Sequence, residues 1–325
     1  MNPGDFWSPF ETKIKNFTDL EKAIGRVSKK WSSATFAWRG QVSADWPLFS
    51  SLYRRLCLTR GPLKAADLPE EDELYLWETK ILADVHRWGL HVSRDVGRLS
   101  ILNQLAALQH HGAPTRLVDV TFNPWIAAWF AVEEKRDNGE LVHEDNDARL
   151  FAIDVTNRLI NENDRRRDWE DNLHRAWPGA APKLKEKRDI WKRRRKPWCS
   201  EAFAWRPPHF DSRIAAQNGG FIFGGVPSTS GPSGQVQWPK SPNSGGNWRI
   251  NEVRTATSLA LRPHKLNAKR GGVTQNAVYS FRVLASAKRE IRKRLEKTFG
   301  YEHKTIYPDF TGFALYGTPE LKSRS

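Results

Sequence analysis

The sequence predicts an α+β fold: one domain carrying two insertions rather than two independent domains. First, the chain has 325 residues of which 39% are hydrophobic, enough for a sizeable core. Second, short β-branched or aromatic segments and amphipathic helical segments follow one another along the chain. Third, residues 160–200 and 225–248 depart from this pattern in composition, and no internal repeat is visible.

The elements before residue 90 follow from apolar spacing and end signals. Residues 18–29 begin with a helix cap and then carry an apolar stripe at helical spacing. The stripe consists of Leu20, Ala23, Ile24 and Val27. Residues 34–38 predict a short strand, and Arg39-Gly40-Gln41 is expected at its exit. A helix is expected from about Glu70 to Arg87 because its first turn is acidic, as the helix dipole favours.

The stretch from 99 to 135 has the clearest pattern. A helical face is expected to end at Gly112, and the β-branched segment Thr115–Thr121 predicts a strand. Asn123 is a helix cap with Pro124 at the first helical position. The following helix, Trp125 to about Lys135, is almost wholly apolar and is therefore expected to be buried.

Beyond this stretch the elements alternate with the two insertions. Strands are expected at 150–155 and 278–284, and a charged helix at 286–299. Residues 160–200 indicate a basic helical insertion, and the Gly/Pro/Ser-rich residues 225–248 indicate a long mobile loop.

Composition bears on compartment and partners. Two cysteines exclude a disulfide framework, no apolar run approaches the length of a membrane span, and the N-terminus lacks a secretory pattern. We therefore expect a soluble cytoplasmic protein without a membrane partner. The net charge of +15 favours polyanions and salt-sensitive binding.

Common catalytic motifs are absent from the sequence. There is no phosphate-binding Gly-x-x-x-x-Gly-Lys-Ser/Thr loop, no dinucleotide Gly-x-Gly-x-x-Gly and no His-Glu-x-x-His or Cys-x-x-Cys metal site. ATPases, ordinary dehydrogenases and zinc hydrolases are therefore disfavoured, and no metal is expected.

Three polar clusters are candidate sites. In 38–41, an arginine beside a glycine offers a two-pronged donor to a phosphate or carboxylate; a surface arginine before a turn is the plainer interpretation. In 109–119, several titratable side chains surround a helix-to-strand corner; capping histidines and an Arg116–Asp119 ion pair are the alternative. In 213–221, Arg213 and Gln217 share a face if the segment is helical, whereas a surface helix end is the plainer interpretation.

The basic run 183–196 has a net charge of +7 and includes tryptophan. Indole stacking and phosphate neutralisation suit single-stranded RNA or DNA, whereas a solvated helix or a docking surface for an acidic protein is equally compatible. The candidate nucleic-acid-binding residues are Trp191, Lys192, Arg193, Arg194, Arg195 and Lys196.

The chain resembles the FRG domain family because it contains four segments that occur together, in this order, in that family. They are 36–41 (Phe-Ala-Trp-Arg-Gly-Gln), 109–124 (Gln-His-His-Gly-Ala-Pro-Thr-Arg-Leu-Val-Asp-Val-Thr-Phe-Asn-Pro), 213–221 and 306–310. Tryptophan replaces the usual Phe or Tyr before Arg-Gly. The resemblance covers residues 19–316 without the insertions, which leaves 1–18 as an N-terminal extension and 317–325 as a tail.

FRG domains are similar in outline to ADP-ribosyltransferases. The resemblance implies a split mixed or antiparallel sheet flanked by helices, with NAD as substrate and no metal. It also implies a cytoplasmic bacterial toxin or phage-defence effector that modifies RNA, in particular mRNA, and blocks translation. A cognate antitoxin, with or without a chaperone, is the implied protein partner.

The resemblance also implies residue roles. The residues implied to bind NAD are Arg39, Gly40, Gln41, Thr115 and Gln217. Those implied in catalysis are His110, Arg116, Asp119 and Glu252. The resemblance leaves the catalytic acid open between Asp119 and Glu252. Arginine-type transferases carry Ser-Thr-Ser and a later Glu-x-Glu, but no Glu-x-Glu follows Ser228-Thr229-Ser230 in this sequence. Two other functions stay open: a metal-independent ribonuclease using His110, His111, Arg116 and Asp119, and a non-catalytic module that binds nucleic acid or an antitoxin.

Overall fold

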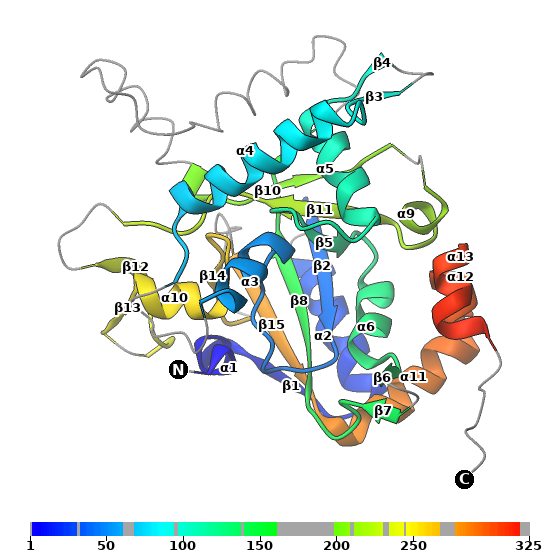
Figure 1. The fold of residues 1–325 in the computed structure, drawn as a ribbon. Helices are drawn as coiled ribbons and strands as arrows, with labels where there is room; N and C mark the ends of the chain where they lie inside the picture. The colour runs from blue at the N-terminus through cyan, green and yellow to red at the C-terminus, as the bar shows by residue number, and fades with distance from the viewer. Residues whose placement is uncertain are drawn as a thin grey trace.

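Most of the chain is described by a computed structural model (Figure 1). It describes residues 2–30, 33–60, 68–93, 97–137, 140–160, 198–208, 211–229, 234–243, 245–266 and 277–318. No helix in these ranges has both the length and the apolar character needed to cross a bilayer. Cys57 and Cys199 are both buried and unbonded to each other.

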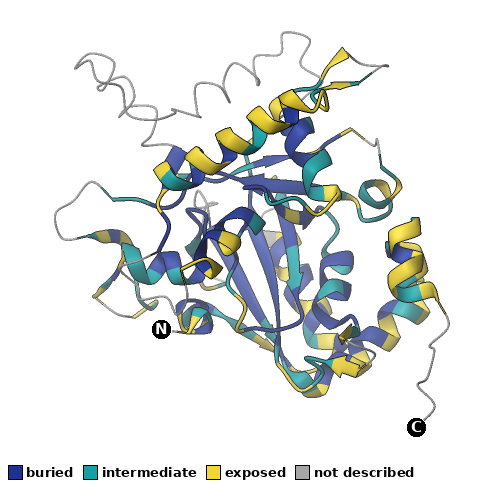
Figure 2. Ribbon diagram, viewed as in Figure 1, coloured by how far each residue is buried: buried dark blue, intermediate teal, exposed yellow. Residues whose placement is uncertain are grey.

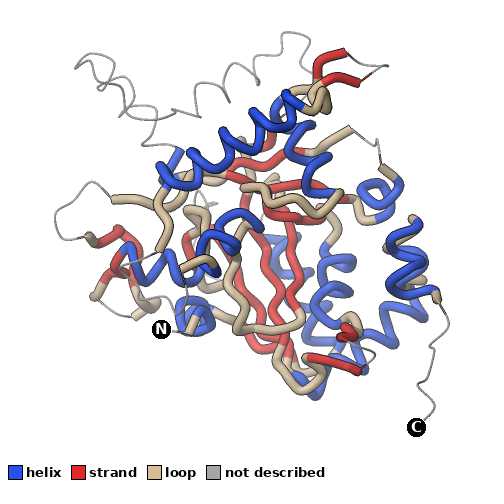
Figure 3. Tube along the Cα trace, viewed as in Figure 1, coloured by secondary structure: helices blue, strands red, loops and turns tan. Residues whose placement is uncertain are grey.

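A mixed sheet of nine strands forms the centre of the described structure (Figure 3). β1 and β14 pair with β15 in parallel, β9 pairs with β10 in parallel, and the other neighbours are antiparallel. The strands, in their order across the sheet, are β1 (Thr12–Ile14), β15 (Ala277–Val283), β8 (Ala148–Asp154), β2 (Phe36–Gln41), β5 (Val118–Thr121), β11 (Gly219–Phe223), β10 (Phe203–Trp205) and β9 (Leu159–Ile160), with β14 (Arg262–Pro263) beside β15.

The sheet is weakest between β2 and β5. β2 pairs with β8 along its whole length, from Phe36 opposite Asp154 to Gln41 opposite Arg149. It meets β5 at one pair, Trp38 opposite Thr121. The two strands therefore separate beyond Trp38, where Arg39 follows.

Helices cover both faces of the sheet (Figure 1). The described helices are α1 (Pro3–Trp7), η1 (Ser8–Phe10), α2 (Phe17–Lys30), α3 (Ser51–Leu58), α4 (Glu71–Arg87), α5 (Ile101–His110), α6 (Pro124–Val132), α9 (Ser212–Ala216), α10 (Ile250–Ala256), α11 (Ala285–Phe299), α12 (His303–Ile306), α13 (Phe310–Gly312) and η3 (Phe313–Gly317). Three small hairpins accompany them: β3–β4 (Val92–Ser93, Gly97–Arg98), β6–β7 (Lys135–Asp137, Glu140–Val142) and β12–β13 (Gln235–Pro239, Asn247–Arg249).

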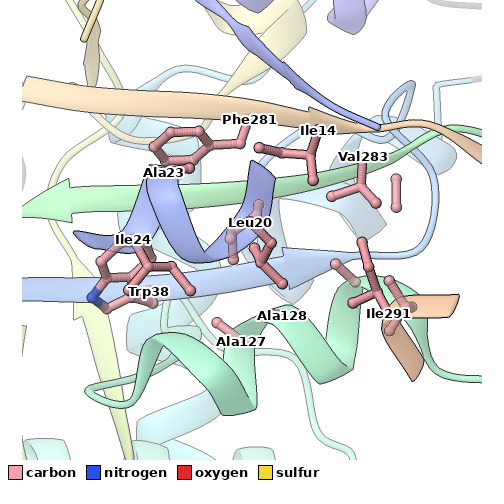
Figure 4. Close-up of a cluster of buried hydrophobic side chains, with 14 of the residues drawn as sticks. Ile14, Leu20, Ala23, Ile24, Trp38, Ala127, Ala128, Phe281, Val283 and Ile291 are labelled. Carbon is pink, nitrogen blue, oxygen red and sulfur yellow. The ribbon is translucent and has the colours of Figure 1, made fainter. Parts of the chain in front are cut away.

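The alternation of side chains along the strands divides the core in two. Trp38, Ala152 and Phe281 pack with α2, α6 and α11 on one face (Figure 4). Their neighbours Ala37 and Ile153 pack with α1 and α10 on the other face. Every residue of β8 is buried because both faces of this strand are covered (Figure 2).

The predicted α+β class is confirmed, and so are several local signals. Asn123 caps α6 by accepting hydrogen bonds from the backbone N–H groups of Trp125 and Ile126, with Pro124 at the first helical position. Gly300 ends α11 with φ +67°, the left-handed conformation that glycine adopts without a Cβ penalty.

Some predicted boundaries were wrong. Arg39-Gly40-Gln41 belongs to β2 rather than to its exit, because the ladder with β8 continues through Gln41. α6 ends at Val132, and Lys135 starts strand β6 instead of closing the helix. The assignment of residues 1–18 to an N-terminal extension stays a prediction; within this range Trp7 is fully buried and β1 pairs with β15.

The two insertions have different outcomes. Residues 225–248 include strand β12 and start β13, so this segment contains a hairpin where a long loop was expected. Within 160–200, residues 161–197 lie outside the described residues, as do 319–325 of the tail. The candidate nucleic-acid-binding residues Trp191 and Lys192–Lys196 fall in that first range.

Candidate functional site

A cavity of about 580 Å³ opens where β2 and β5 separate. This volume lies within the usual range of small-molecule sites, about 300–1,000 Å³. Residues from all four sequence segments line it: Arg39, Gly40 and Gln41; Gln109, His110, Asp119 and Thr121; Arg213, Gln217 and Phe221; and Tyr307. The segments are up to 268 residues apart in the chain, so the tertiary fold brings them together.

Arg39 and Gln41 leave polar atoms free at the cavity. The Arg39 guanidinium donates through Nη1 to the backbone oxygen of Asp119, while its buried Nε has no partner within the described structure. Burial lowers the pKa of Arg39, and Arg54 lowers it further, although Asp119 opposes the shift. Gln41 is 5% exposed; its Nε2 donates to the oxygen of Pro47, and its Oε1 is buried without a described partner.

Gly40 is required by packing. A Cβ at this position would lie 2.0 Å from the backbone oxygen of Ala127 and 2.5 Å from the backbone nitrogen of Ala131. Gly40 therefore allows the close approach of α6 to β2, and it also lines the cavity.

Asp119 is held by a short chain of hydrogen bonds. Leu117 donates its N–H to Thr115 Oγ1 at 3.1 Å, Thr115 donates its hydroxyl to Gln109 Oε1, and Gln109 Nε2 donates to Asp119 Oδ1 at 2.8 Å. Because the Gln109 oxygen is used by Thr115, its amide must offer N–H to the carboxylate. Thr115 is 1% exposed and does not line the cavity, so it positions Asp119 through Gln109.

His110 lies at the end of α5 and faces an acid across the cavity rim. Its Nε2 is 3.3 Å from Asp211 Oδ2, and Asp211 also caps α9 through the N–H groups of Arg213 and Ile214. His111 is exposed, contacts His110 edge to face, and is not part of the wall.

Arg213 and Gln217 attach the last segment of the chain to the cavity. Arg213 forms a two-pronged ion pair with Asp309, with Nε and Nη2 each 2.7 Å from a carboxylate oxygen. Gln217 Nε2 donates to the backbone oxygen of Ile306 at 3.0 Å. Both residues therefore hold Tyr307 in the wall, where the Arg213 guanidinium lies 5.2 Å from its ring centroid.

Glu133 is a further wall residue, which no sequence pattern singled out. This carboxylate lines the cavity just after α6, is 4% exposed, pairs with Lys135 at 2.7 Å, and accepts a hydrogen bond from the Tyr307 hydroxyl at 3.0 Å. Burial raises its pKa above the ordinary value, although Lys135 and Tyr307 oppose the shift. An acid that ends an otherwise apolar buried helix was the available signal.

Besides Thr115, the two predicted catalytic residues Arg116 and Glu252 lie outside the cavity wall. Arg116 is 1% exposed and forms ion pairs with Glu71 and Glu78 at 3.2 and 2.7 Å, away from the cavity wall. The Arg116–Asp119 ion pair of the alternative interpretation does not form, because the Arg116 guanidinium is bonded to Glu78, Glu71 and the backbone oxygen of Gly224. Glu252 caps α10 and pairs with Lys240 at 2.7 Å, also outside the wall.

Among the described residues, the carboxylates that line the cavity are therefore those of Asp119 and Glu133. In the part of the chain that the structure describes, no group of three His, Cys, Asp or Glu side chains is arranged to hold a metal ion.

Comparison with known families matches residues 34–140 to the FRG domain. Residues 34–140 are therefore similar to the FRG domain. The matched range of the FRG domain includes Arg39, Gln109, Asp119 and Glu133, whereas Arg213 and Tyr307 complete the same cavity from outside it. Neither the comparison with curated proteins nor that with solved structures gave a match.

Proposed function

We propose that the FRG domain is an NAD-dependent ADP-ribosyltransferase whose acceptor is RNA. The observation that carries this proposal is the convergence of four distant segments on one cavity, with unpartnered buried polar atoms of Arg39 and Gln41 in its wall. A buried donor without a partner is costly unless a ligand satisfies it. The separation of β2 from β5 also suits the split sheet that the family resemblance implies.

The charges and rings of the wall fit a dinucleotide. Arg39 and Arg54 line the cavity, and neither forms an ion pair within the described ranges, so two guanidinium groups can face a diphosphate. Trp46, Phe49 and Tyr307 line the cavity, so the flat rings of a dinucleotide have aromatic surfaces on which to stack.

The proposed reaction transfers the ADP-ribosyl group. The bond between nicotinamide nitrogen and ribose C1′ breaks with both electrons going to nicotinamide, a bond forms from C1′ to an oxygen or nitrogen of RNA, and that atom releases a proton. Asp119 and Glu133 supply the negative charge that stabilises a cationic sugar, and either carboxylate accepts the proton. His110, oriented by Asp211, is the alternative proton acceptor.

The test combines purified full-length protein, NAD labelled in the adenylate part and total RNA. We expect nicotinamide release together with label on intact RNA. Arg39→Gln should lower turnover at least tenfold, as should Asp119→Asn or Glu133→Gln. Arg87→Gln, at a 76% exposed side chain far along α4, is the matched control and should behave as the unmodified protein.

Two other results would contradict the proposal. RNA that becomes shorter without NAD would identify a metal-independent ribonuclease, which the His110–Asp211 pair at 3.3 Å would then serve. RNA binding with no turnover in any condition would identify a non-catalytic module.

The cellular role belongs to the same proposal. We propose a cytoplasmic bacterial toxin or phage-defence effector that blocks translation by modifying mRNA and is restrained by a cognate antitoxin, with or without a chaperone. Expression of the unmodified chain without a partner should stop protein synthesis, whereas expression of Arg39→Gln should not.

A further inference from the structure

The carboxylate of Glu133 lies where three parts of the chain meet at the cavity. It is the C-cap of α6, it precedes β6, and it contacts residues 303–317 through Tyr307. Oε1 is 2.7 Å from Lys135 Nζ, and Oε2 accepts a hydrogen bond from the Tyr307 hydroxyl at 3.0 Å. All three side chains line the cavity. Because an ionised carboxyl accepts about four hydrogen bonds, each oxygen can accept one more, from a ligand.

The two groups that contact Glu133 are linked to each other. Lys135 Nζ also donates to the Tyr316 hydroxyl at 3.4 Å, and the Tyr316 ring stacks on Tyr307 with 4.9 Å between the centroids. The His303 ring stacks on Tyr316 with centroids 4.2 Å apart. Rings from the last part of the chain therefore hold both the ammonium and the phenol that contact Glu133.

Arg292 of α11 is the other cation close to this carboxylate. Its Nε donates to the backbone oxygen of Val132 at 2.6 Å. Its Nη1 and Nη2 pair with Glu134 and Glu144 at 2.8 and 2.6 Å. The charge of Arg292 is therefore balanced by carboxylates other than Glu133.

Glu133 and Asp119 line the same cavity but differ in their surroundings. Glu133 is 4% exposed and ends a helix, where the helix dipole disfavours negative charge, whereas Asp119 is exposed to solvent. Burial favours the neutral form of a carboxyl and raises the pKa of Glu133. Two carboxyls in different surroundings can divide into one that moves a proton and one that stays charged. These surroundings suit Glu133 to the proton and Asp119 to the positive charge of the sugar.

We propose that Lys135 and Tyr307 are positioning residues that orient Glu133 and favour its ionised form, so that Glu133 rather than Asp119 takes the proton of the acceptor. In this step a lone pair of the acceptor atom forms the bond to ribose C1′. The O–H or N–H bond of that atom breaks, its electrons stay on the atom, and the proton moves to a Glu133 oxygen. A carboxyl that is already protonated cannot take it. The inference rests on the proposed function because it assigns one step of that reaction.

The first test measures nicotinamide release from NAD by the full chain, with RNA present, as a function of pH. Glu133→Gln should lower kcat about 10²- to 10⁴-fold and abolish its fall at low pH. Lys135→Met should lower kcat about tenfold at pH 6 and little at pH 8.5, because a carboxyl without its cation is ionised only at higher pH. Lys135→Arg should restore the profile, and Tyr307→Phe should act as Lys135→Met does, to a smaller extent. Asp119→Asn and His110→Asn should lower kcat but leave unchanged the pH at which it falls.

The second test needs no turnover. The infrared carbonyl band of the protonated Glu133 carboxyl, identified by its absence from Glu133→Gln, is followed against pH in the full chain. In Lys135→Met this band should persist to higher pH than in the unmodified protein. Lys80→Met, at an exposed position of α4, is the matched control and should leave both the band and kcat unchanged.

Three results would overturn the inference. They are an unchanged infrared titration in Lys135→Met, an equal loss of kcat at every pH in that variant, and a low-pH fall that disappears with Asp119→Asn or His110→Asn instead of Glu133→Gln. Circular dichroism melts check that each variant folds, and Tyr307→Phe carries both tests if Lys135→Met does not. Absence of NAD turnover together with a shifted band contradicts the proposed function and leaves Lys135 as the group that sets the ionisation of Glu133.

Discussion

Replacing Arg116 with methionine should destabilise the fold without acting on the cavity. The guanidinium donates to Glu78 at 2.7 Å, to Glu71 at 3.2 Å and to the backbone oxygen of Gly224 at 3.0 Å, and all three side chains are at most 3% exposed. Removing one partner of such a buried pair leaves uncompensated charge and costs about 3–5 kcal/mol. This is a large part of a typical unfolding free energy of about 5–15 kcal/mol.

The loss of stability should depend on the charges of the two glutamates that Arg116 leaves unpaired. In Arg116→Met/Glu71→Gln/Glu78→Gln the unpaired carboxylates are gone, so at least half of the lost stability should return. The single variant should also lose less stability at pH 5 than at pH 8. Burial already raises the pKa of Glu71 and the guanidinium opposes this shift; without Arg116 the carboxyl is protonated at higher pH, and stability is lost as pH rises through that value.

The assay is urea unfolding followed by tryptophan fluorescence, with Arg116→Lys as a milder variant in case the methionine variant does not fold. A stability loss below about 1 kcal/mol, combined with a loss of NAD binding, would refute the reasoning. It would place Arg116 in the functional site, as the sequence had predicted.

Two further predictions concern stability. Gly40→Ala should lower the free energy of unfolding in urea by about 3 kcal/mol or more, because its Cβ would meet α6 backbone that cannot rotate away. Gly25→Ala in α2, where a Cβ has open space, should instead raise this free energy by about 1 kcal/mol. Equal effects of the two variants would contradict this expectation. Burial lowers the pKa of His264 to about 4, whereas a histidine in an unfolded chain has a pKa of about 6.5. The unfolded chain therefore binds a proton at a higher pH than the folded protein does. Stability should fall by about 1–2 kcal/mol between pH 7 and pH 5, with partial exposure of the side chain taken into account. His264→Asn should remove that part of the pH dependence, and an unchanged slope would show that His264 is not its source.

The sequence predicted local structure where one residue type has one physical reason to be there. Asn123 and Pro124 mark a helix start because few other residues satisfy the first N–H groups and tolerate the fixed φ. Arg39, Asp119 and Gln217 were singled out because they belong to the three polar clusters that the FRG resemblance joins, and all three line the cavity.

The remainder depended on tertiary contacts. The sequence does not distinguish the role of Arg116 from that of Arg39. Arg116 stabilises the fold because it pairs with Glu71 and Glu78, which precede it by 45 and 38 residues. Glu133 was overlooked because its partner Tyr307 is 174 residues distant. The reason for Gly40 is the path of α6, which no local pattern contains.

The wall of the cavity begins at Trp38 and is completed at Tyr307. A nascent chain therefore has no finished pocket while it is being translated, since Tyr307 must leave the ribosome and dock on Arg213 before the enclosure exists. Any N-terminal fragment that stops short of this tyrosine lacks one side of the chamber, so proteolysis between β15 and α12 would dismantle it without touching Arg39 or Asp119.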